Sequence, residues 1–503
     1  MPLNKGTLSG VSWLMAGRLG SVALSAISNA VLARLLTPGE FGTVAAALMV
    51  TTFAAAIFES SYGLNLIRRN TTRPEDIRTT LTFGILLSGT AYGIIVLTAP
   101  RVEAFFGFDG LGLLLTVLGL TLPMRCVLSV ATSQLQIEGR FNLMARAVFI
   151  ATFVGSLLFG VPMGILGFGI WALATATLVT SALECAMLVR PARLSFKPMI
   201  DRQALREIFS TSIFNLATIL NSFANNALTA IVGRSLGESS LGIYSRASKL
   251  LELFVSATAA QMARVFIPLY SQSREDPDSG QATMKAVLDV LYPIYAVISL
   301  LAVLHAPFVV ALLLGEQWDQ AAPVAAVLFA SIFPRCIAKA YQNYSVANGV
   351  LHASASRQGI YAGAMVIGAW IAVPYGLVAI AVSALAAVWL LYLLSMTYAV
   401  RISGLAWRHI AALHLRLPVL LIPVGVADYS VLRMLDDYPL LLAHALSGCI
   451  GAVVLLVMSV LSPEAFVGRD WGARLRSARI RALSRLANAA RSIRRGHMGR
   501  STP

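Results

Sequence analysis

Six basic residues occupy positions inside long apolar segments of the sequence: Arg18, Arg125, Arg246, Lys249, Arg335 and Lys339. An unpaired charge inside a bilayer is costly, so ionisable residues in such places usually face one another or an aqueous cavity. Lysine, and especially the forked guanidinium of arginine, binds phosphate oxygens well. If the six side chains line one cavity, that cavity is cationic and favours an anionic cargo.

The spacing of these residues places several of them on common helix faces. Arg246, Lys249 and Glu252 follow one another at intervals of three, and Arg335 and Lys339 are four apart. Residues three or four apart lie on one face of a helix. The alternative interpretation is structural, because long basic side chains also reach the membrane interface and a ladder of opposite charges also packs helices together.

Four further residues are candidates for other contacts with a transported ion or cargo. Glu59 and Asp289 are candidate proton or sodium sites, although intramembrane carboxylates are also found paired with a nearby cation. Asn221 and Asn225 are candidate contacts for sugar hydroxyls, and polar contacts between helices explain them equally well.

Catalytic and metal-binding patterns are not evident in the sequence. The six histidines form no HExxH motif, the four cysteines form no CxxC pair, and no GxxxxGK[ST] segment occurs. We therefore expect no metal, no other cofactor and no enzymatic activity, and we expect the energy for any transport to come from a gradient or from consumption of the product.

The elements that must hold these residues are membrane helices. Of the 503 residues, 57% are hydrophobic and 12% are charged, and the mean hydropathy is +0.75. A single soluble core cannot bury so much apolar surface. Apolar runs long enough to cross a bilayer predict fourteen spans, at about residues 11–32, 41–62, 81–99, 111–135, 143–163, 167–188, 208–231, 241–270, 286–306, 321–347, 358–373, 375–399, 411–430 and 439–461.

The distribution of basic residues between the spans predicts the orientation. If both termini are cytoplasmic, 29 basic residues lie in the cytoplasmic connections and termini and 4 lie in the external connections. Basic loops resist translocation, so this asymmetry favours cytoplasmic termini. The net charge of +16 is explained by these basic cytoplasmic loops. We therefore expect no nucleic-acid partner.

The chain carries an internal repeat. The segment from Arg34 to Gly42 matches the segment from Arg234 to Gly242 at an offset of 200, and Arg125 matches Arg335 at an offset of 210. A duplicated unit of six helices has both copies entering the membrane from the same side. We therefore expect lobes at residues 1–200 and 201–405, two additional helices at 406–462, and a basic amphipathic cytoplasmic tail at 463–503.

Three short segments resemble a known family. They are Leu32-Ala33-Arg34-Leu35-Leu36-Thr37-Pro38-Gly39-Glu40-Phe41-Gly42, Leu135-Gln136-Ile137-Glu138-Gly139-Arg140-Phe141 and Leu313-Leu314-Gly315-Glu316-Gln317-Trp318. Together with the repeat, they resemble the Wzx-type polysaccharide flippases of the multidrug/oligosaccharidyl-lipid/polysaccharide (MOP) exporter superfamily, and the likeness extends to about Ala399.

The resemblance implies an all-α, V-shaped, MATE-like fold of two parallel six-helix lobes plus two extra helices. It further implies a transporter of the bacterial inner membrane that moves undecaprenyl-diphosphate-linked oligosaccharide across the bilayer for exopolysaccharide or lipopolysaccharide synthesis. Membrane lipids and a polysaccharide polymerase complex are the other expected partners. The family motifs do not assign the cargo contacts, so the six cations rest on sequence position alone.

The sequence leaves two alternative functions open. A drug or small-molecule exporter of the same superfamily usually carries a cation, which the six embedded basic residues disfavour. A membrane polymerase or ligase acting on the same lipid-linked sugars is expected to have a long external loop, whereas the external connections here are short.

Overall fold

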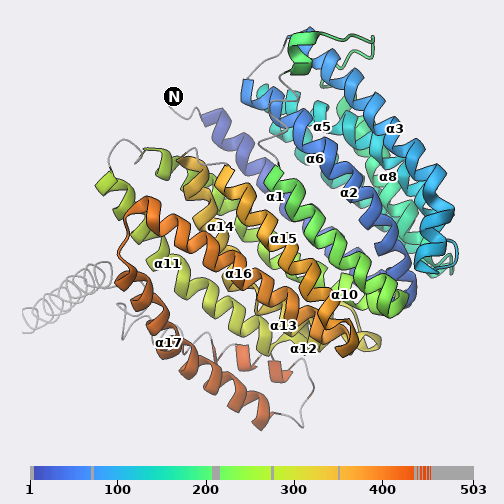
Figure 1. Cartoon of the computed structure of the whole chain (residues 1–503). Helices are drawn as coiled ribbons and strands as arrows, with labels where there is room; N and C mark the ends of the chain where they lie inside the picture. Colours follow the sequence, from blue (N-terminus) through green and yellow to red (C-terminus); the bar gives the residue numbers. More distant parts are fainter. Residues whose placement is uncertain are drawn as a thin grey trace, which may run out of the picture. The chain divides into compact units, whose positions relative to one another are not determined.

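The computed structural model describes residues 5–69, 73–206, 216–272, 277–348 and 352–435, together with short stretches between 439 and 454. The described residues are helical almost throughout and contain no β-strand (Figure 1). Among them, nine helices are long and apolar enough to cross a membrane. The chain is therefore an all-α, multi-pass membrane protein, as the sequence predicts.

The first six predicted spans coincide with helices. In chain order these are α1 (Lys5–Leu35), α2 (Pro38–Arg69), α3 (Pro74–Phe106), α4 (Leu111–Gly119) with α5 (Thr121–Ile137), α6 (Phe141–Thr152) with the π-helix η1 (Phe153–Gly160) and α7 (Val161–Ile165), and α8 (Ile170–Val189). The π-helical turn lies where small residues let helices approach. A Cβ atom on Gly155 would overlap the Thr180 hydroxyl of α8, in keeping with close packing through small residues in membrane helices.

The later spans begin with one long helical segment. They comprise α10 (Leu216–Gln272), α11 (Pro277–Leu304), α12 (Ala306–Leu313), the 3₁₀ turn η2 (Glu316–Trp318), α13 (Ala321–Phe329), α14 (Ile332–Ala347), α15 (His352–Ala372), η3 (Val373–Tyr375), α16 (Leu377–Ser403) and α17 (Trp407–Met434). Inside α10, Gly237 has φ 83° and ψ 177°. This non-helical residue separates the two spans predicted on either side of it.

The last two predicted spans have different outcomes. The thirteenth is the continuous helix α17, which contains Pro418 and Pro423. Most of the fourteenth, and the whole of the basic tail from residue 463, lie outside the described residues. The count of fourteen helices therefore stays a prediction.

Two compact units divide the chain. One comprises residues 1–253, 309–328 and 350–391, and the other comprises residues 254–308, 329–349 and 392–503. In the second unit, the buried hydroxyl groups of Tyr292, Tyr341 and Tyr392 meet. Tyr292 is 2.8 Å from Tyr341 and 2.7 Å from Tyr392, and the Tyr392 hydroxyl also lies 2.7 Å from Nε2 of His414. These contacts join α11, α14, α16 and α17 through satisfied polar groups.

Candidate functional site

The site begins at the tight connection between α1 and α2. Thr37 precedes α2, and its backbone N–H donates to the Glu40 carboxylate at 2.7 Å, while the Glu40 N–H donates to the Thr37 hydroxyl at 3.3 Å. This reciprocal pair is a capping box, which satisfies backbone donors at a helix start. The Thr37-Pro38-Gly39-Glu40 part of the first family segment therefore fixes how the chain enters α2.

The third family segment docks on the end of α1. The indole N–H of Trp318 donates to the carbonyl oxygen of Ala33 at 2.8 Å, and the Gln317 amide donates to the same oxygen and to that of Leu36. In return, Arg34 donates to the carbonyl of Leu312 at 3.0 Å. Carbonyls at the last turn of a helix lack partners within the helix, so the segment at 313–318 caps α1.

A buried aromatic pair adjoins this contact. Phe41 and Trp318 are both fully buried, and their rings meet edge to face with centroids 5.3 Å apart. The guanidinium carbon of Arg246, from α10, lies 4.4 Å from the centroid of the Phe41 ring. Cations at this distance from an aromatic face are attracted by its quadrupole, most strongly where water is excluded. Phe41 thus supports the guanidinium from one side.

Arg246 has one further polar contact and a surplus of charge. Its Nη1 donates to the side-chain carbonyl of Asn29 on α1 at 3.0 Å. Among the described residues, no carboxylate lies within ion-pair distance of this half-buried guanidinium. A guanidinium has five N–H donors and does not lose its proton in proteins. The arrangement can therefore accept an anion, and its planar fork suits phosphate.

The other predicted cations have different surroundings. Lys249, three residues after Arg246, is exposed and pairs with Glu252 at 2.8 Å. Arg335 of α14 donates from Nε, at 3.1 Å, to the hydroxyl of Ser331, the residue just before that helix. Lys339 is exposed on α14, Arg125 is half-buried on α5, and the side chain of Arg18 lies outside the described residues. Of these cations, Arg246 is thus the one held by both a hydrogen bond and an aromatic ring in the described structure, and the sequence alone does not identify these contacts.

The candidate sugar contacts lie on the first part of α10. Asn221 is exposed, and the Asn225 side chain donates to the Asn221 backbone carbonyl at 2.8 Å. This bond uses one amide donor within the helix and leaves the amide oxygen of Asn225 available to other donors.

The candidate ion-coupling residues are Asp289 and Glu59. The buried carboxylate of Asp289 lies 3.1 Å from Nε2 of His409, whereas the side chain of Glu59 lies outside the described residues. Together with Tyr292 and Arg416, Asp289 also borders a small cavity with a volume of about 10 Å³. This is about the least room that holds one water.

Two glycines at equivalent positions of the repeat cross in direct backbone contact. A Cβ atom on Gly42 would overlap the carbonyl oxygen of Glu238, and one on Gly242 would overlap the carbonyl of Pro38 and lie 3.1 Å from the backbone nitrogen of Gly42. Glycine alone permits this approach because it lacks a Cβ atom. The matching segments found in the sequence therefore pack against each other.

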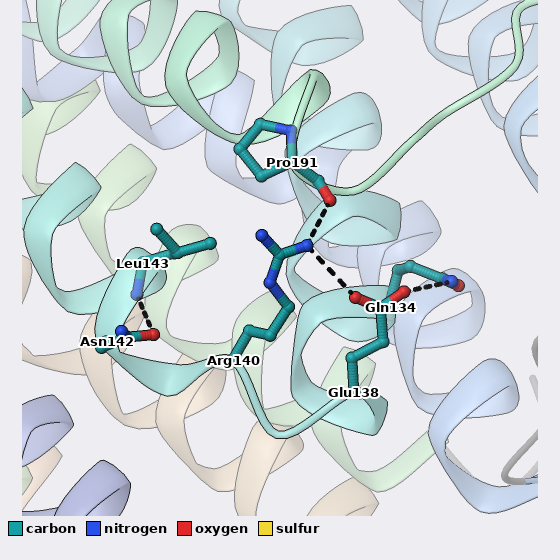
Figure 2. Close-up of polar contacts among 6 residues, drawn as sticks. All are labelled: Gln134, Glu138, Arg140, Asn142, Leu143 and Pro191. Carbon is teal, nitrogen blue, oxygen red and sulfur yellow. Dashed lines mark hydrogen bonds and ion pairs between the residues drawn. The ribbon is translucent and has the colours of Figure 1, made fainter.

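The second family segment forms a separate polar cluster at the end of α5 (Figure 2). Gly139 has φ 70°, and Arg140 N–H donates to the Leu135 carbonyl at 2.9 Å, which is a Schellman ending of the helix. The Arg140 guanidinium donates to the carbonyl of Pro191 at 2.8 Å and lies 3.5 Å from Glu138. The segment therefore fastens the α5–α6 turn to the residues that follow α8.

Three residues of the site, Asn29, Phe41 and Trp318, were not predicted from the sequence. Phe41 and Trp318 were visible only as members of the family segments. One feature of the sequence could have indicated Asn29: it is a polar amide within an apolar helix, close to the first of those segments.

Known proteins resemble the chain in sequence and in fold. The succinoglycan biosynthesis transport protein ExoT of Rhizobium meliloti (strain 1021) is 26% identical over 337 residues, which are 63% of this chain and 64% of that protein. The match thus spans just under two thirds of that relative.

Solved structures also share the fold. The lipid II flippase MurJ, in an inward closed conformation, superposes with a TM-score of 0.72 at 12% identity, over 90% of this chain and 99% of its own. An inward-facing multidrug resistance MATE family transporter of the MOP superfamily superposes with a TM-score of 0.61 at 15% identity, over 76% and 94%.

The polysaccharide biosynthesis protein family matches residues 31–323, a region that contains all three of the family segments described above. This region is more than half of the chain and includes Phe41, Arg246 and Trp318. The protein therefore belongs to the polysaccharide biosynthesis protein family.

Proposed function

We propose that the protein is a flippase that moves undecaprenyl-diphosphate-linked oligosaccharide from the cytoplasmic to the periplasmic leaflet of the bacterial inner membrane, for exopolysaccharide or lipopolysaccharide synthesis. Membership of a polysaccharide biosynthesis family supports this proposal. So do a relative named as a biosynthesis transport protein and a fold shared with a lipid II flippase.

The observation that carries the proposal is the environment of Arg246. Its guanidinium is held by the Asn29 carbonyl and the Phe41 ring, and it has no carboxylate partner among the described side chains. A charge kept in this state needs an anion from elsewhere. The diphosphate of a lipid-linked saccharide supplies oxygens that match two N–H donors of the guanidinium at once.

The remaining candidates have supporting roles in this proposal. The further candidate cations for binding the cargo are Arg18, Arg125, Lys249, Arg335 and Lys339. The cation Lys249 already has an acidic neighbour, so we expect it to add less than Arg246. Asn221 and Asn225 contact the sugars, and Glu59 and Asp289 are the candidate ion-coupling residues. The lipid tail stays in the bilayer while the headgroup crosses, and no enzymatic step is involved.

The crossing of Gly42 and Gly242 supports alternating access in this proposal. With both termini in the cytoplasm, this crossing lies at the external end of α2 and of the second part of α10. The first lobe, 1–200, and the second, 201–405, then close the external side by direct backbone contact. Rocking one lobe against the other separates the two glycines and opens a route outward.

A complementation experiment in the native bacterium tests the function. Deletion of the gene should abolish the polysaccharide and leave lipid-linked repeat units on the inner leaflet, and the wild-type gene should reverse both effects. Arg246→Ala should fail to restore export at equal membrane abundance.

Arg234→Ala is the matched control for that variant. Arg234 is also an arginine of α10 and also lies over an aromatic ring, 5.4 Å from the centroid of Phe105, but it is exposed. We expect its loss to leave export near the wild-type level. A deletion strain that exports normally and becomes sensitive to cationic drugs would instead favour a drug exporter of the same fold.

A further inference from the structure

The interface between α11 and α17 contains two histidine–aspartate pairs. In one pair the aspartate belongs to α11, and in the other it belongs to α17. The two helices lie side by side in the second unit (Figure 1). Asp289 of α11 faces His409 of α17 at 3.1 Å. His305, directly after α11, faces Asp428 of α17 at 3.6 Å. The residue numbers of both partners increase from the first pair to the second, so α11 and α17 run parallel. The two pairs lie about 24 Å apart along α11.

The second pair belongs to a larger buried cluster. The Asp428 carboxylate is 0% exposed, and it accepts a hydrogen bond from the Ser447 hydroxyl. The ring of His444 lies 5.0 Å from that of His305 and stacks on Phe308 at 5.1 Å. One carboxylate, two imidazoles and one hydroxyl therefore meet inside the described part of this unit.

The geometry assigns a tautomer to His305. Its Nδ1 lies 3.1 Å from the carbonyl oxygen of Leu301 and 3.6 Å from the Asp428 carboxylate. Both neighbours are acceptors, so Nδ1 carries the hydrogen and Nε2 is the position that takes up an additional proton. An added proton at Nε2 makes His305 an imidazolium directly opposite the carboxylate.

The charge of the cluster changes with one proton. With neutral imidazoles and ionised Asp428, its formal charge is negative, and burial in an apolar surrounding makes such a charge costly. One proton, on His305 or on Asp428, brings the formal charge to zero. A second proton would leave the cluster with a net positive charge in the same buried surroundings, which is again costly.

No other charged side chain described in the structure occupies the cluster. From α12 the neighbouring side chain is Phe308. On α17, Arg433 is exposed, and its Nε donates to the Tyr429 hydroxyl at 3.2 Å rather than to Asp428. The titratable groups that face one another are thus Asp428 with His305 and His444.

We propose that Asp428, His305 and His444 form a proton-binding site, and that its occupancy is coupled to movement of the cargo. This second statement rests on the proposed flippase function. The ligand is a proton rather than Na⁺, because hard cations prefer several oxygen ligands and two of the three groups here are imidazoles. Histidine also changes its charge between about pH 5 and pH 8. With cytoplasmic termini, these ends of α11 and α17 face the outside, which is the acidic side of an energised inner membrane.

Infrared difference spectroscopy tests proton binding without any transport. Purified full-length protein in lipid nanodiscs is compared at about pH 8.5 and about pH 5.5, a range that covers histidine titration. We expect carboxyl and imidazole bands that change between the two conditions and that are lost in Asp428→Asn. Asp109→Asn, at an exposed carboxylate of a connection, should leave the difference spectrum unchanged. Identical difference spectra for Asp428→Asn and wild type would overturn the site.

A leaflet-distribution measurement tests the coupling. In proteoliposomes, a gradient of one pH unit coupled to one proton per cargo should shift the ratio of fluorescent lipid-linked saccharide between leaflets by about tenfold. In Asp428→Asn and in His444→Gln, the gradient should no longer shift the ratio. A full shift in both variants would overturn the coupling. If wild-type vesicles move no saccharide, the proposed function fails, while the infrared bands still decide whether Asp428 and its neighbours bind a proton.

Discussion

The guanidinium carbon of Arg246 lies 4.4 Å from the centroid of the Phe41 ring, although the two residues are about two hundred positions apart in the chain. Phe41 packs in turn against Trp318. Asn29 of α1 and Phe41 of α2 thereby contact one cation of α10, and Trp318 packs behind the Phe41 ring.

Replacing Arg246 with lysine should reduce export without abolishing it. Lysine keeps the positive charge, but it lacks the planar fork that matches phosphate and that lies flat on an aromatic ring. A hydrogen bond to a charged group contributes about 1.5–3 kcal/mol, so loss of one of the two bonds to the diphosphate should weaken cargo binding by about tenfold or more. Titration of lipid-linked saccharide against the purified protein measures the effect. Equal affinity of Arg246→Lys and Arg246→Ala for the saccharide would contradict a contribution of the positive charge to cargo binding.

Replacing Trp318 with alanine should destabilise the protein. The substitution removes a fully buried ring and leaves the Ala33 carbonyl without the indole donor. Loss of a large buried aromatic costs about 3–5 kcal/mol in protein cores. Thermal denaturation in detergent should show a lower midpoint than wild type. Trp370→Ala is the control, because Trp370 is 61% exposed, and an equal loss in both variants would contradict the capping role of Trp318.

Replacing Gly42 with alanine should open the crossing with the second repeat. The added Cβ atom would overlap the Glu238 carbonyl, which belongs to the backbone and has little freedom to move. In a variant without native cysteines, Thr43→Cys should react slowly with a thiol reagent because Thr43 is buried. The reaction should become faster when Gly42→Ala is added. Gly93→Ala, at a helical glycine with open space around it, should not change the rate.

Much of the fold followed from the sequence because long apolar runs dictate membrane helices. The first thirteen predicted spans fall on helices where the structure describes them, and the non-helical residue Gly237 lies between two of these spans. The family segments around Arg34 and Trp318 were recognised from their residues, but nothing in their spacing indicated that they bind each other. That contact depends on how distant helices pack.

The candidate site was predicted only as a set of charges. Periodicity put Arg246 and Lys249 on one helix face, yet it could not indicate that Asn29 and Phe41 hold the first while Glu252 neutralises the second. The histidines illustrate the same limit. His305 lies far from Asp428 in sequence and becomes its neighbour because α11 and α17 pack together, while the ring of His444 contacts His305 from a later stretch of the chain.

The orientation of the chain is open to direct labelling. With cytoplasmic termini, Glu316→Cys should react with a membrane-impermeant thiol reagent added to intact cells, and Arg73→Cys should react only after the membrane is permeabilised. Both residues are exposed, so access depends on the side of the membrane. The reverse pattern would overturn the orientation and would move the Gly42 crossing to the cytoplasmic side.

Transfer of a lipid-linked saccharide by the purified protein tests the central claim most directly. Proteoliposomes carrying fluorescent undecaprenyl-diphosphate-linked saccharide are treated with an impermeant quencher, and the fraction that changes leaflet is followed over time. We predict transfer by wild type and by Arg234→Ala, and transfer close to that of protein-free liposomes for Arg246→Ala. Transfer by Arg246→Ala at the wild-type rate, or none by the wild type, would contradict the account.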